Sequence, residues 1–463
     1  MRFVNRVSEL AALERWWRVP GGRSALVWGR RRVGKTALLQ VFAQDKPAVF
    51  HVGAGRPRRA ELSQLSDRML SAGLAGVRDL ASRPFSDWDD ALDHLAERAV
   101  DTPILLVLDE FPELVLAAPD LPGILRAFLD RTGGRTQLRL LLCGSAVRSM
   151  QALGEERAPL YGRFDLNLQL HPFRPHEAAL MLPGLSAADL AAVYGLVGGM
   201  PLYLSWWDQS ADLAANLTRL ACQPGAPLLS EGQLVLATEA APGEQLSAVM
   251  HAISAGKTRH SEIKNWLGVE PARSLDRLQE LRLVEQVRPV TERRPSRQRR
   301  YRIADNFLSF YLGVLSRYRD EIDRGLAASI LPVLIASLDD HLGPAWEDAF
   351  RDHLRLRAGR GDFGGEVVAV GPWWTPDSRN ELDAVALAGR ARRPVLVGEA
   401  KWARREDSKR LLADLHRKAA VLTDEPEQLI YVVAAREQLT GLPSSPTSTT
   451  LAVTAADLFA PDV

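Results

Sequence analysis

The chain has 463 residues and a formal net charge of +1; 46% of its residues are hydrophobic and 25% are charged. This length is too great for one ordinary core, so we expect about two to four domains. The near-zero net charge excludes a polycation, so a nucleic-acid surface would have to be a local patch. The two distant cysteines, Cys143 and Cys222, argue against a disulfide framework or a zinc site and are typical of a reducing cytosol.

The first residues of the chain predict neither export nor membrane insertion. Residues 1–6 (MRFVNR) are followed by charged residues, which is not typical of a signal peptide. No apolar stretch reaches the length that spans a bilayer, so we expect a cytoplasmic protein without membrane contact. Residues 3–10 (FVNRVSEL) precede a helical pattern. They predict either a segment that covers an adenine or a helix capped by Ser8.

Residues 29–36 read GRRRVGKT, which is the spacing of a phosphate-binding loop. The apolar run 24–28 before it predicts a strand, and residues 37–42 after it have helical spacing. The two glycines let several backbone N–H groups point at one anion, and the helix N-terminus adds a positive partial charge. We expect Lys35 to reach the β- and γ-phosphates of ATP and Thr36 to hold Mg²⁺. The predicted nucleotide contacts in this loop are Gly29, Val33, Gly34, Lys35 and Thr36.

Residues 103–110 (PILLVLDE) predict a buried parallel strand that ends in two carboxylates. Ligands of open α/β sheets bind at the carboxyl edge of the strands. We expect Asp109 to join the Mg²⁺ shell and Glu110 to polarise the attacking water. The alternative is that both residues cap the next helix. Before this strand, Ser86 and Asp89 have the spacing of a capping box and predict a helix start.

Residues 138–145 (LRLLLCGS) predict the next buried strand. Ser145 at its end either senses the γ-phosphate or is a small turn residue. Arg163 precedes a predicted strand at 165–170, where it either reaches a phosphate in a neighbouring subunit or forms a plain surface ion pair. Strands that alternate with helices, including one at 48–52, predict an α/β fold with a parallel sheet.

These segments resemble the AAA+/STAND group of P-loop ATPases, and specifically the archaeal-type ATPase family also found in bacteria. The matching segments in residues 1–240 are FVNRVSEL, with Asn5 where the family usually has glycine, then GRRRVGKT, LVLDE, LLCGS, YGRF at 161–164 and GGMP at 198–201. The resemblance implies an ASCE-type sheet, Mg-ATP binding and hydrolysis, and self-association into rings or nucleotide-dependent oligomers. It also implies that Pro201 begins the inner face of a helical lid near the nucleotide.

The middle of the chain predicts helices and then a small DNA-binding fold. Residues 177–218 have a helical pattern, and residues 219–240 carry prolines and glycines that predict a connector. A winged helix-turn-helix is predicted by three short helices and two strands, at 248–253, 258–267, 270–281, 283–287 and 301–303.

An arginine-rich wing lies between the two predicted strands of this fold. Residues 288–302 contain seven arginines and one acid, Glu292, a composition that suits contacts to DNA phosphates. A solvated hairpin, or a winged helix used only for protein packing, is the alternative. The predicted DNA contacts are Arg293, Arg294, Arg297, Arg299 and Arg300.

A helical linker at 305–342 leads to a second α/β pattern. Its predicted strands lie at 366–371, 380–387, 394–401 and 428–434, with a helix at 409–422. Strand alternation places Glu399 and Lys401 on one face, with Asp383 on the adjoining strand. We expect Asp383 and Glu399 to bind Mg²⁺, or alternatively Mn²⁺, and Lys401 to orient or activate water beside a scissile phosphate. Glu347, on the preceding helix, is a further candidate metal ligand.

This spacing resembles the PD-(D/E)xK restriction-endonuclease-like fold. Archaeal-type ATPases that carry such a C-terminal domain form an architecture that the chain matches along nearly its whole length. The resemblance implies a metal-dependent nuclease. A fossil fold or a buried ion pair is the alternative reading of the same residues. His353 and His416 have no partner pattern and are predicted to be surface or packing residues.

The predicted architecture is an α/β protein with a P-loop ATPase core, a helical lid, a winged helix, a helical linker and a restriction-endonuclease-like α/β domain. Their predicted ranges are 1–171, 172–240, 241–304, 305–342 and 343–463, in that order. We expect an ATP-driven protein that acts on DNA and cuts it with Mg²⁺, in mobile-element processing or defence. The alternatives are a STAND-like nucleotide switch, or a DNA-binding regulator, whose C-terminal domain is a non-cleaving assembly module.

Overall fold

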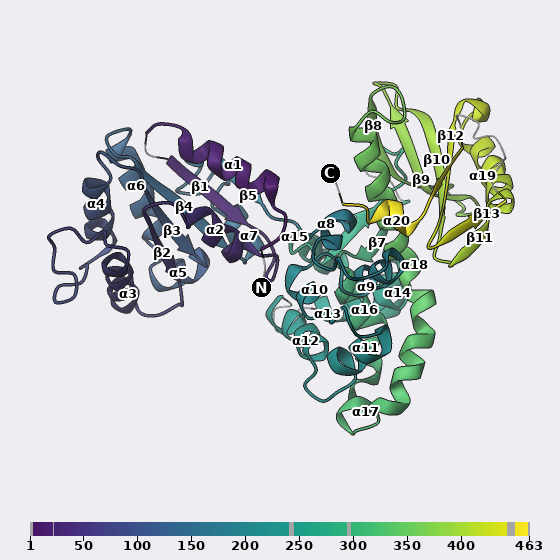
Figure 1. Ribbon diagram of the computed structural model, residues 1–463, viewed down its shortest axis with the longest axis horizontal. Helices are drawn as coiled ribbons and strands as arrows, with labels where there is room; N and C mark the ends of the chain where they lie inside the picture. The colour runs from purple at the N-terminus through teal and green to yellow at the C-terminus, as the bar shows by residue number, and fades with distance from the viewer. Residues whose placement is uncertain (1–2, 22, 240–244, 294–297, 442–449, 462–463) are drawn as a thin grey trace. The chain divides into compact units, whose positions relative to one another are not determined.

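The computed structural model describes residues 3–21, 23–239, 245–293, 298–441 and 450–461. The chain divides into two units, Met1–Pro172 and Phe173–Val463, and each has its own five-stranded sheet (Figure 1). No helix within the described ranges is both long enough and apolar enough to cross a bilayer.

The first unit is built on a parallel sheet in the order β2-β3-β4-β1-β5. Its strands are β1 (Arg23–Trp28), β2 (Ala48–Val52), β3 (Ile104–Asp109), β4 (Leu138–Gly144) and β5 (Leu166–Gln169). All six residues of β3 and all seven of β4 are buried, as expected for strands that are covered on both faces. The predicted α/β fold with a parallel central sheet is confirmed.

Helices cover both faces of this sheet. They are α1 (Val7–Arg18), α2 (Lys35–Ala43), α3 (Arg58–Ser71), α4 (Trp88–Arg98), α5 (Phe111–Ala117), α6 (Leu121–Thr132) and α7 (Val147–Ala152). Alternate strand residues such as Leu106 and Leu108 share one core with α3, α4 and α6. The other face is covered by α1 and α2, where Trp16 packs on Phe42 with ring centroids 6.4 Å apart. The two-residue period of the strands therefore separates two cores.

The start of α4 differs from the prediction by one residue. Asp87, not Ser86, is the N-cap, and its carboxylate accepts a hydrogen bond from the backbone N–H of Asp90 at 2.8 Å. The Ser86 hydroxyl instead donates to Asp87 and Asp90. A carboxylate at the cap position accepts the amide hydrogen bond and leaves the preceding hydroxyl as a donor.

The second unit begins with helices and a hairpin. The helices are α8 (Pro175–Ala179), α9 (Ala187–Val197), α10 (Pro201–Ser205), α11 (Leu213–Ala221), α12 (Pro227–Glu239), α13 (Leu246–Ser254), α14 (His260–Leu267), α15 (Ala272–Glu280), α16 (Asn306–Gly313), the 3₁₀ turn η1 (Leu315–Tyr318) and α17 (Arg319–Asp323). The hairpin pairs β6 (Val284–Val287) with β7 (Arg300–Ile303) in antiparallel register and follows α13, α14 and α15.

Helix α12 lies where the sequence predicts a connector, so that prediction is wrong. Pro227 is its first residue, a position where proline is tolerated because the missing N–H has no partner there. Gly232 lies against the ring of Tyr311, and a Cβ atom on it would come within 2.2 Å of that ring. The glycine allows close packing with α16 rather than marking a loop.

The rest of the second unit is a long helix and a mixed sheet in the order β14-β12-β10-β9-β8. Its elements are α18 (Ala327–Gly359), β8 (Val367–Trp374), β9 (Glu381–Ala388), β10 (Arg393–Lys401), β11 (Arg405–Asp407), α19 (Ser408–Leu422), the 3₁₀ turn η2 (Pro426–Gln428), β12 (Ile430–Ala435), β13 (Gln438–Thr440), β14 (Thr450–Val453) and α20 (Ala455–Leu458). Strands β8, β9 and β10 are antiparallel, whereas β10, β12 and β14 are parallel.

Helix α18 runs without a break through residues 342 and 343, where the sequence predicts the end of a linker. Pro332 and Pro344 lie inside the helix. Phe350 on this helix packs against Gly398 of β10, where a Cβ atom would come within 2.8 Å of the ring. The last part of the predicted linker and the helix that carries Glu347 are therefore one element, which packs on the sheet.

Candidate functional site

The predicted phosphate-binding loop connects β1 to α2 in the first unit. Gly34 caps α2 with a φ of 93°, a left-handed conformation that favours glycine. Lys35 and Thr36 are therefore the first two residues of α2, and the amides of its first turn have no helical partners. Gly29 is required for a different reason, because a Cβ atom there would lie 2.5 Å from the carbonyl oxygen of Leu170.

The side chain of Lys35 lies inside this loop. Its Nζ donates to the carbonyl oxygens of Gly29 at 2.9 Å and of Arg30 at 3.0 Å. Burial lowers the pKa of Lys35, and the neighbouring Glu110 and Asp109 oppose that shift. The ammonium is held at the place where the loop amides would meet an anion.

Thr36 and Asp109 meet at the carboxyl edge of the sheet. The Thr36 hydroxyl donates to Oδ2 of Asp109 at 2.7 Å, and Asp109 is buried. A hydroxyl and a carboxylate side by side are oxygen ligands of the kind that Mg²⁺ binds. Burial and the nearby Asp109 raise the pKa of the Cys143 thiol well above its ordinary value, so this cysteine is a neutral neighbour.

Glu110 and Ser145 also meet at this edge. Glu110 has a left-handed backbone (φ 48°), uncommon for a residue with a side chain. Its Oε2 accepts hydrogen bonds from the hydroxyl of Ser145 at 2.9 Å and from the backbone N–H of Ser145 at 3.2 Å. The end of β4 therefore orients the carboxylate that follows β3.

Two other residues that the sequence predicts at the nucleotide site have different surroundings. Arg163 forms an ion pair with Asp130, with Nε 2.8 Å from Oδ1 and both side chains more than a third exposed. This contact matches the alternative of a plain surface ion pair, and a contact to a phosphate in a neighbouring subunit stays a prediction. Pro201 belongs to the second unit, where it is buried as the first residue of α10. In the same GGMP segment, a Cβ atom on Gly199 would come within 1.8 Å of the Phe173 carbonyl oxygen.

Arg6 lies beside the predicted phosphate-binding loop, and the sequence did not reveal its role. Its buried guanidinium donates to the carbonyl oxygen of Val33 at 3.0 Å and of His171 at 2.7 Å. It thereby ties the N-terminal segment to the phosphate-binding loop. Its neighbour Asn5 has a φ of 59°, and asparagine tolerates this conformation better than most residues. That tolerance explains why asparagine can stand at a position typical of glycine.

The second candidate site is the acidic cluster, defined as Glu347, Asp383, Glu399 and Lys401. Asp383 lies on β9, Glu399 and Lys401 on the neighbouring β10, and Glu347 on α18. The carboxylate of Asp383 accepts a hydrogen bond from the backbone N–H of Ala400 at 2.8 Å. Lys401 Nζ lies 2.6 Å from Oε1 of Glu399.

Electrostatics show that these side chains share one environment. Burial, followed by repulsion from Glu399, raises the pKa of Asp383 to about 6. Burial, followed by repulsion from Asp383, raises the pKa of Glu347 to about 8. Carboxylates that resist ionisation in this way would be stabilised by a bound cation.

Lys418 is a further member of this site that the sequence did not reveal. This residue of α19 places Nζ 3.1 Å from both carboxylate oxygens of Glu399 and 2.9 Å from Oδ2 of Asp414. The side chain of Glu399 is only 6% exposed. It is paired with two lysines, Lys401 and Lys418. Across the described ranges, no group of three or more His, Cys, Asp or Glu side chains is arranged to hold a metal ion.

An arginine network connects the acidic cluster to the β6–β7 hairpin. Arg302 of β7 pairs with Glu285 of β6 and with Asp348 of α18. Arg351 also pairs with Asp348, lies 3.5 Å from Glu347, and donates to the carbonyl oxygen of Asp383 at 2.7 Å. Asp348 and Arg351 thus connect the hairpin to the cluster: Arg302 contacts Asp348, and Arg351 contacts both Asp348 and the cluster.

The predicted DNA-contacting arginines are partly engaged within the second unit. Arg300 pairs with Glu381 and stacks over Trp374 at 4.3 Å, and Arg293 donates to the carbonyl oxygen of Arg390 at 3.0 Å. Arg299 lies over the ring of Tyr301 at 5.9 Å. Arg294 and Arg297 are outside the described residues. These contacts are compatible with the alternative in which the predicted winged helix is used only for protein packing, and DNA contact stays a prediction.

Comparisons with known proteins identify the class of the first unit. Residues 3–206 match a family described as an ATPase domain predominantly from Archaea. This match supports the predicted archaeal-type P-loop ATPase domain in that part of the chain. Residues 311–411 match a family described as archaeal and bacterial proteins of unknown function. Neither match identifies a nuclease, so that interpretation of the C-terminal domain stays a prediction.

Individual relatives resemble the chain over most or part of its length. It is 23% identical over 446 residues to an uncharacterized protein of Methanocaldococcus jannaschii, covering 94% of this chain and 96% of that one. An uncharacterized ATP-binding protein of the same organism is 48% identical over 44 residues, covering 10% of this chain and 75% of that protein. The structure of a Walker-type ATPase of Pyrococcus abyssi aligns with a TM-score of 0.53 and 19% identity, covering 67% and 96%. That structural likeness supports the fold.

Proposed function

We propose that the chain hydrolyses Mg-ATP and acts on DNA, and that its C-terminal domain cleaves phosphodiesters with a divalent cation. The ATPase part rests on one observation, the meeting of Thr36 with Asp109 and of Glu110 with Ser145 at one sheet edge. The proposal includes self-association in the nucleotide-bound form, which light scattering with a non-hydrolysable ATP analogue would measure.

Each side chain at the nucleotide site has a role in this proposal. Lys35 would contact the β- and γ-phosphates, while the first-turn amides of α2 bind phosphate oxygens. Thr36 and Asp109 fit a Mg²⁺ ion by donor type, and the ion would neutralise charge between the phosphates. Glu110 would accept a proton from the attacking water, with Ser145 holding its carboxylate.

Two substitutions separate binding from hydrolysis. We expect Lys35→Ala to abolish turnover and weaken ATP binding, because it removes the buried ammonium. We expect Glu110→Gln to retain ATP binding and lose turnover. Glu97→Gln, an exposed site on α4, is the matched control and should behave as wild type. Full turnover in Glu110→Gln would contradict the assigned base.

The cleavage part rests on the convergence of the acidic cluster from α18, β9 and β10. Asp383 and Glu347 would bind a divalent ion. The pKa values of both are raised, and a bound cation would stabilise their ionised forms. Glu399 would have to exchange a lysine contact for the ion, since two lysines pair with it. A bound Mg²⁺ or Mn²⁺ would supply charge stabilisation at the phosphate. Lys401 would orient the water.

A plasmid assay tests the cleavage proposal. Supercoiled plasmid is incubated with Mg²⁺ or Mn²⁺, with and without ATP, and nicking is followed on gels. We expect nicking by the wild type and loss of nicking in Asp383→Asn and Lys401→Ala. Lys409→Ala, an exposed lysine at the start of α19, is the control. No cleavage by the wild type under any nucleotide condition would remove the nuclease proposal.

The alternative function is a nucleotide switch or DNA-binding regulator with a non-cleaving C-terminal module. The pairing of Glu399 with Lys401 and Lys418 favours this alternative, because a neutralised ion-pair network does not require a cation. In that case Asp383→Asn and Lys401→Ala would alter stability or assembly without changing a phosphodiester bond.

DNA contact by the wing requires its own measurement. Binding to duplex DNA is followed at rising salt concentration. Each phosphate contact contributes about one unit to the slope of log affinity against log salt concentration. We expect Arg299→Ala to flatten the slope. Replacing Arg300 removes a contact to Glu381 within the protein, so its effect reports on packing as well. An unchanged slope in Arg299→Ala and Arg300→Ala would exclude phosphate contacts by these side chains.

A further inference from the structure

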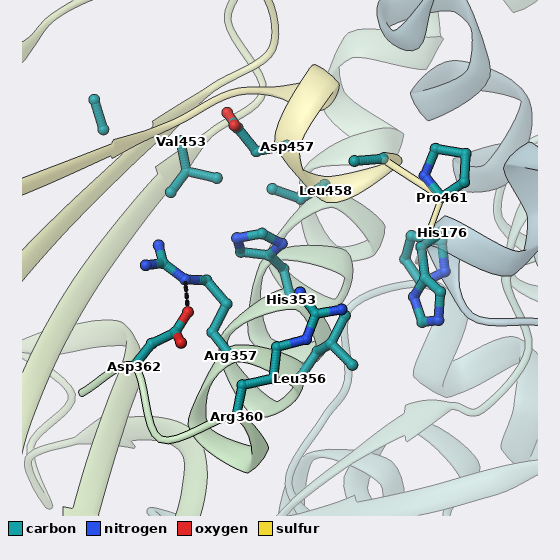
Figure 2. A pocket seen from close by; sticks show the side chains of 13 residues that line it. His176, His353, Leu356, Arg357, Arg360, Asp362, Val453, Asp457, Leu458 and Pro461 are labelled. Atoms are coloured by element: carbon teal, nitrogen blue, oxygen red, sulfur yellow. Dashed lines mark hydrogen bonds and ion pairs between the residues drawn. The ribbon is translucent and has the colours of Figure 1, made fainter. Parts of the chain in front are cut away.

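A cavity of about 570 Å³ lies in the second unit among α8, the end of α18, β14 and α20 (Figure 2). This volume is within the range of about 300–1,000 Å³ that small-molecule sites occupy. Its polar lining residues are His176, His353, Arg357, Arg360, Asp362 and Asp457. Leu356, Val453 and Leu458 contribute apolar walls. None of these residues belongs to the acidic cluster.

Three donors come from one face of a single helix and its end. His353, Arg357 and Arg360 are spaced i, i+4 and i+7, so they follow one stripe of α18 into the cap that ends it. Figure 2 shows their side chains around the cavity, with Arg357 beside Asp362. The rigid helix therefore presents two guanidiniums and an imidazole together.

Both acids of the lining are already engaged by the protein. Oδ2 of Asp362 lies 2.8 Å from Nε of Arg357. The carboxylate of Asp457 accepts hydrogen bonds from the backbone N–H and the hydroxyl of Thr454, at 2.7 and 2.9 Å, and so caps α20. The pair with Asp362 uses only Nε of Arg357. The two terminal amino groups of Arg357 are thus suited to bind an anion in a bidentate manner.

His353 is the second feature that indicates a ligand. The sequence predicts a surface or packing residue, but its imidazole lines the cavity (Figure 2). Burial, followed by repulsion from Arg357, lowers its pKa to about 4, so the ring is neutral at pH 7. A neutral imidazole offers one donor and one acceptor, as a hydroxyl or a ring nitrogen of a ligand requires.

We propose that this cavity binds a small organic phosphate of about mononucleotide size. Arg357 and Arg360 would bind the phosphate, His353 would hydrogen-bond the organic part, and Leu356 and Leu458 would pack against it. The site would be an effector site that is independent of the phosphate-binding loop and of the acidic cluster.

The charges and the volume select this class of ligand. Two arginines are balanced by two carboxylates, so the lining lacks the net positive field that attracts nucleic-acid polyanions. Directed hydrogen bonds from guanidinium forks can still bind one phosphate group. Inorganic phosphate alone would leave most of the cavity and its apolar walls empty.

Calorimetric titration of the full chain tests this proposal. The phosphate-binding loop is first saturated with Mg-ADP, and AMP, ribose 5-phosphate, adenosine, inorganic phosphate and a 5′-phosphorylated oligonucleotide are then titrated separately. We expect AMP or ribose 5-phosphate to bind one further site, with the same affinity in a Lys35→Ala chain. Adenosine and inorganic phosphate should each bind at least about tenfold more weakly than that ligand.

Variants assign the binding to the cavity. We expect Arg360→Ala to weaken binding at least about tenfold, because it removes a charge-assisted contact. Ala460→Trp should block binding by filling the cavity while keeping every charge. Arg355→Ala is the control, since Arg355 lies on the same helix and contacts Asp352 and Val370 instead. Thermal melts confirm that each variant is folded.

Several results would overturn the proposal. These are no further site for either organic phosphate, unchanged binding in both Arg360→Ala and Ala460→Trp, equal affinity for inorganic phosphate, or preference for the oligonucleotide. None of these outcomes depends on whether the chain hydrolyses ATP or cleaves DNA.

Discussion

The nucleotide site and the acidic cluster both gather polar side chains at a sheet, but they balance charge differently. At the nucleotide site, Thr36 contacts Asp109 and Ser145 contacts Glu110, so hydroxyls orient carboxylates without neutralising them. In the acidic cluster, Glu399 is paired with two lysines, and Asp383 and Glu347 have raised pKa values.

The difference follows from where the side chains are attached. The nucleotide site is made of turns that follow parallel strands, where backbone amides are available to bind an anion. The side chains of the acidic cluster stand on paired strands and on a packed helix, where most backbone groups are already hydrogen-bonded, although the N–H of Ala400 donates to Asp383. Counter-charges must therefore come from side chains such as Lys418 and Arg351. The candidate nucleotide site leaves backbone amides available, whereas Glu399 of the cluster is compensated by lysines.

The largest expected effect lies at the nucleotide site. We expect Asp109→Asn to lower ATP turnover at least about a hundredfold, because the amide is a weaker ligand for the ion that Thr36 and Asp109 would share. Steady-state phosphate release measures this loss. Asp101→Asn, an exposed site just before the same strand, is the matched control and should retain full activity. Comparable losses in both variants would point to stability rather than to ligand binding.

The next effect tests the compensation within the second unit. Asp348→Ala leaves the guanidiniums of Arg302 and Arg351 without their shared carboxylate. The side chain of Asp348 is 30% exposed. We therefore expect the free energy of unfolding to fall by about 2–3 kcal/mol, between the values for exposed and fully buried ion pairs. Urea unfolding measures the loss. Asp352→Ala, which breaks only an exposed pair with Arg355, should cost less than about 1 kcal/mol.

A third substitution tests whether the cluster can be made more like the nucleotide site. Lys418→Ala frees Glu399 from one of its two lysines, so we expect roughly tenfold tighter Mn²⁺ binding, the size of one unit-charge interaction in a partly solvated site. Calorimetry with Mn²⁺ measures the affinity, and Lys409→Ala is the control. Unchanged affinity in Lys418→Ala would favour the non-cleaving assembly module.

The smallest effect is a pH dependence of stability in the second unit. Burial lowers the pKa of His341 to about 4, and its ring packs on Phe310 with centroids 5.8 Å apart. Between this value and the unfolded pKa of about 6.5, the unfolded chain binds more protons. The free energy of unfolding therefore falls as the pH drops from about 6.5 towards 4.

A phenylalanine at this position removes that titration. We expect the stability lost between pH 7 and pH 5 to be about 1–2 kcal/mol smaller in His341→Phe than in the wild type. Urea unfolding at both pH values measures the difference. The same loss in both proteins would show that the folded chain accepts the proton at His341 without cost.

Much of the first unit could be predicted because its signals are local. GRRRVGKT, LVLDE and LLCGS each combine a strand with the turn that follows it, and each prediction needs only neighbours in the chain. The errors have local causes as well. Ser86 and Asp89 matched a capping box, but Asp87 between them accepts hydrogen bonds more strongly. In α12, Gly232 resembles a loop residue until Tyr311 is seen against it.

The candidate sites depended more on residues distant in sequence. Strand alternation predicted that Glu399 and Lys401 share a face, and the structure brings Asp383 and Glu347 into their electrostatic environment. Lys418 carries no signal of its own, because a lysine on an amphipathic helix is usually a solvated residue. His353 likewise has no local pattern that distinguishes a cavity wall from a surface.

The amino-acid sequence by itself determined the phosphate-binding loop, the order of the strands along the chain and the acids at their ends. Backbone amides, glycine conformations and hydrophobic periods act over a few residues, so these features can be read in any short window. Only the tertiary structure decided the partners of Glu399, the engagement of Arg300 with Glu381 and the cavity beside α18. Charge pairing and cavity shape depend on side chains far apart in the chain, and folding alone brings them within a few ångströms of each other.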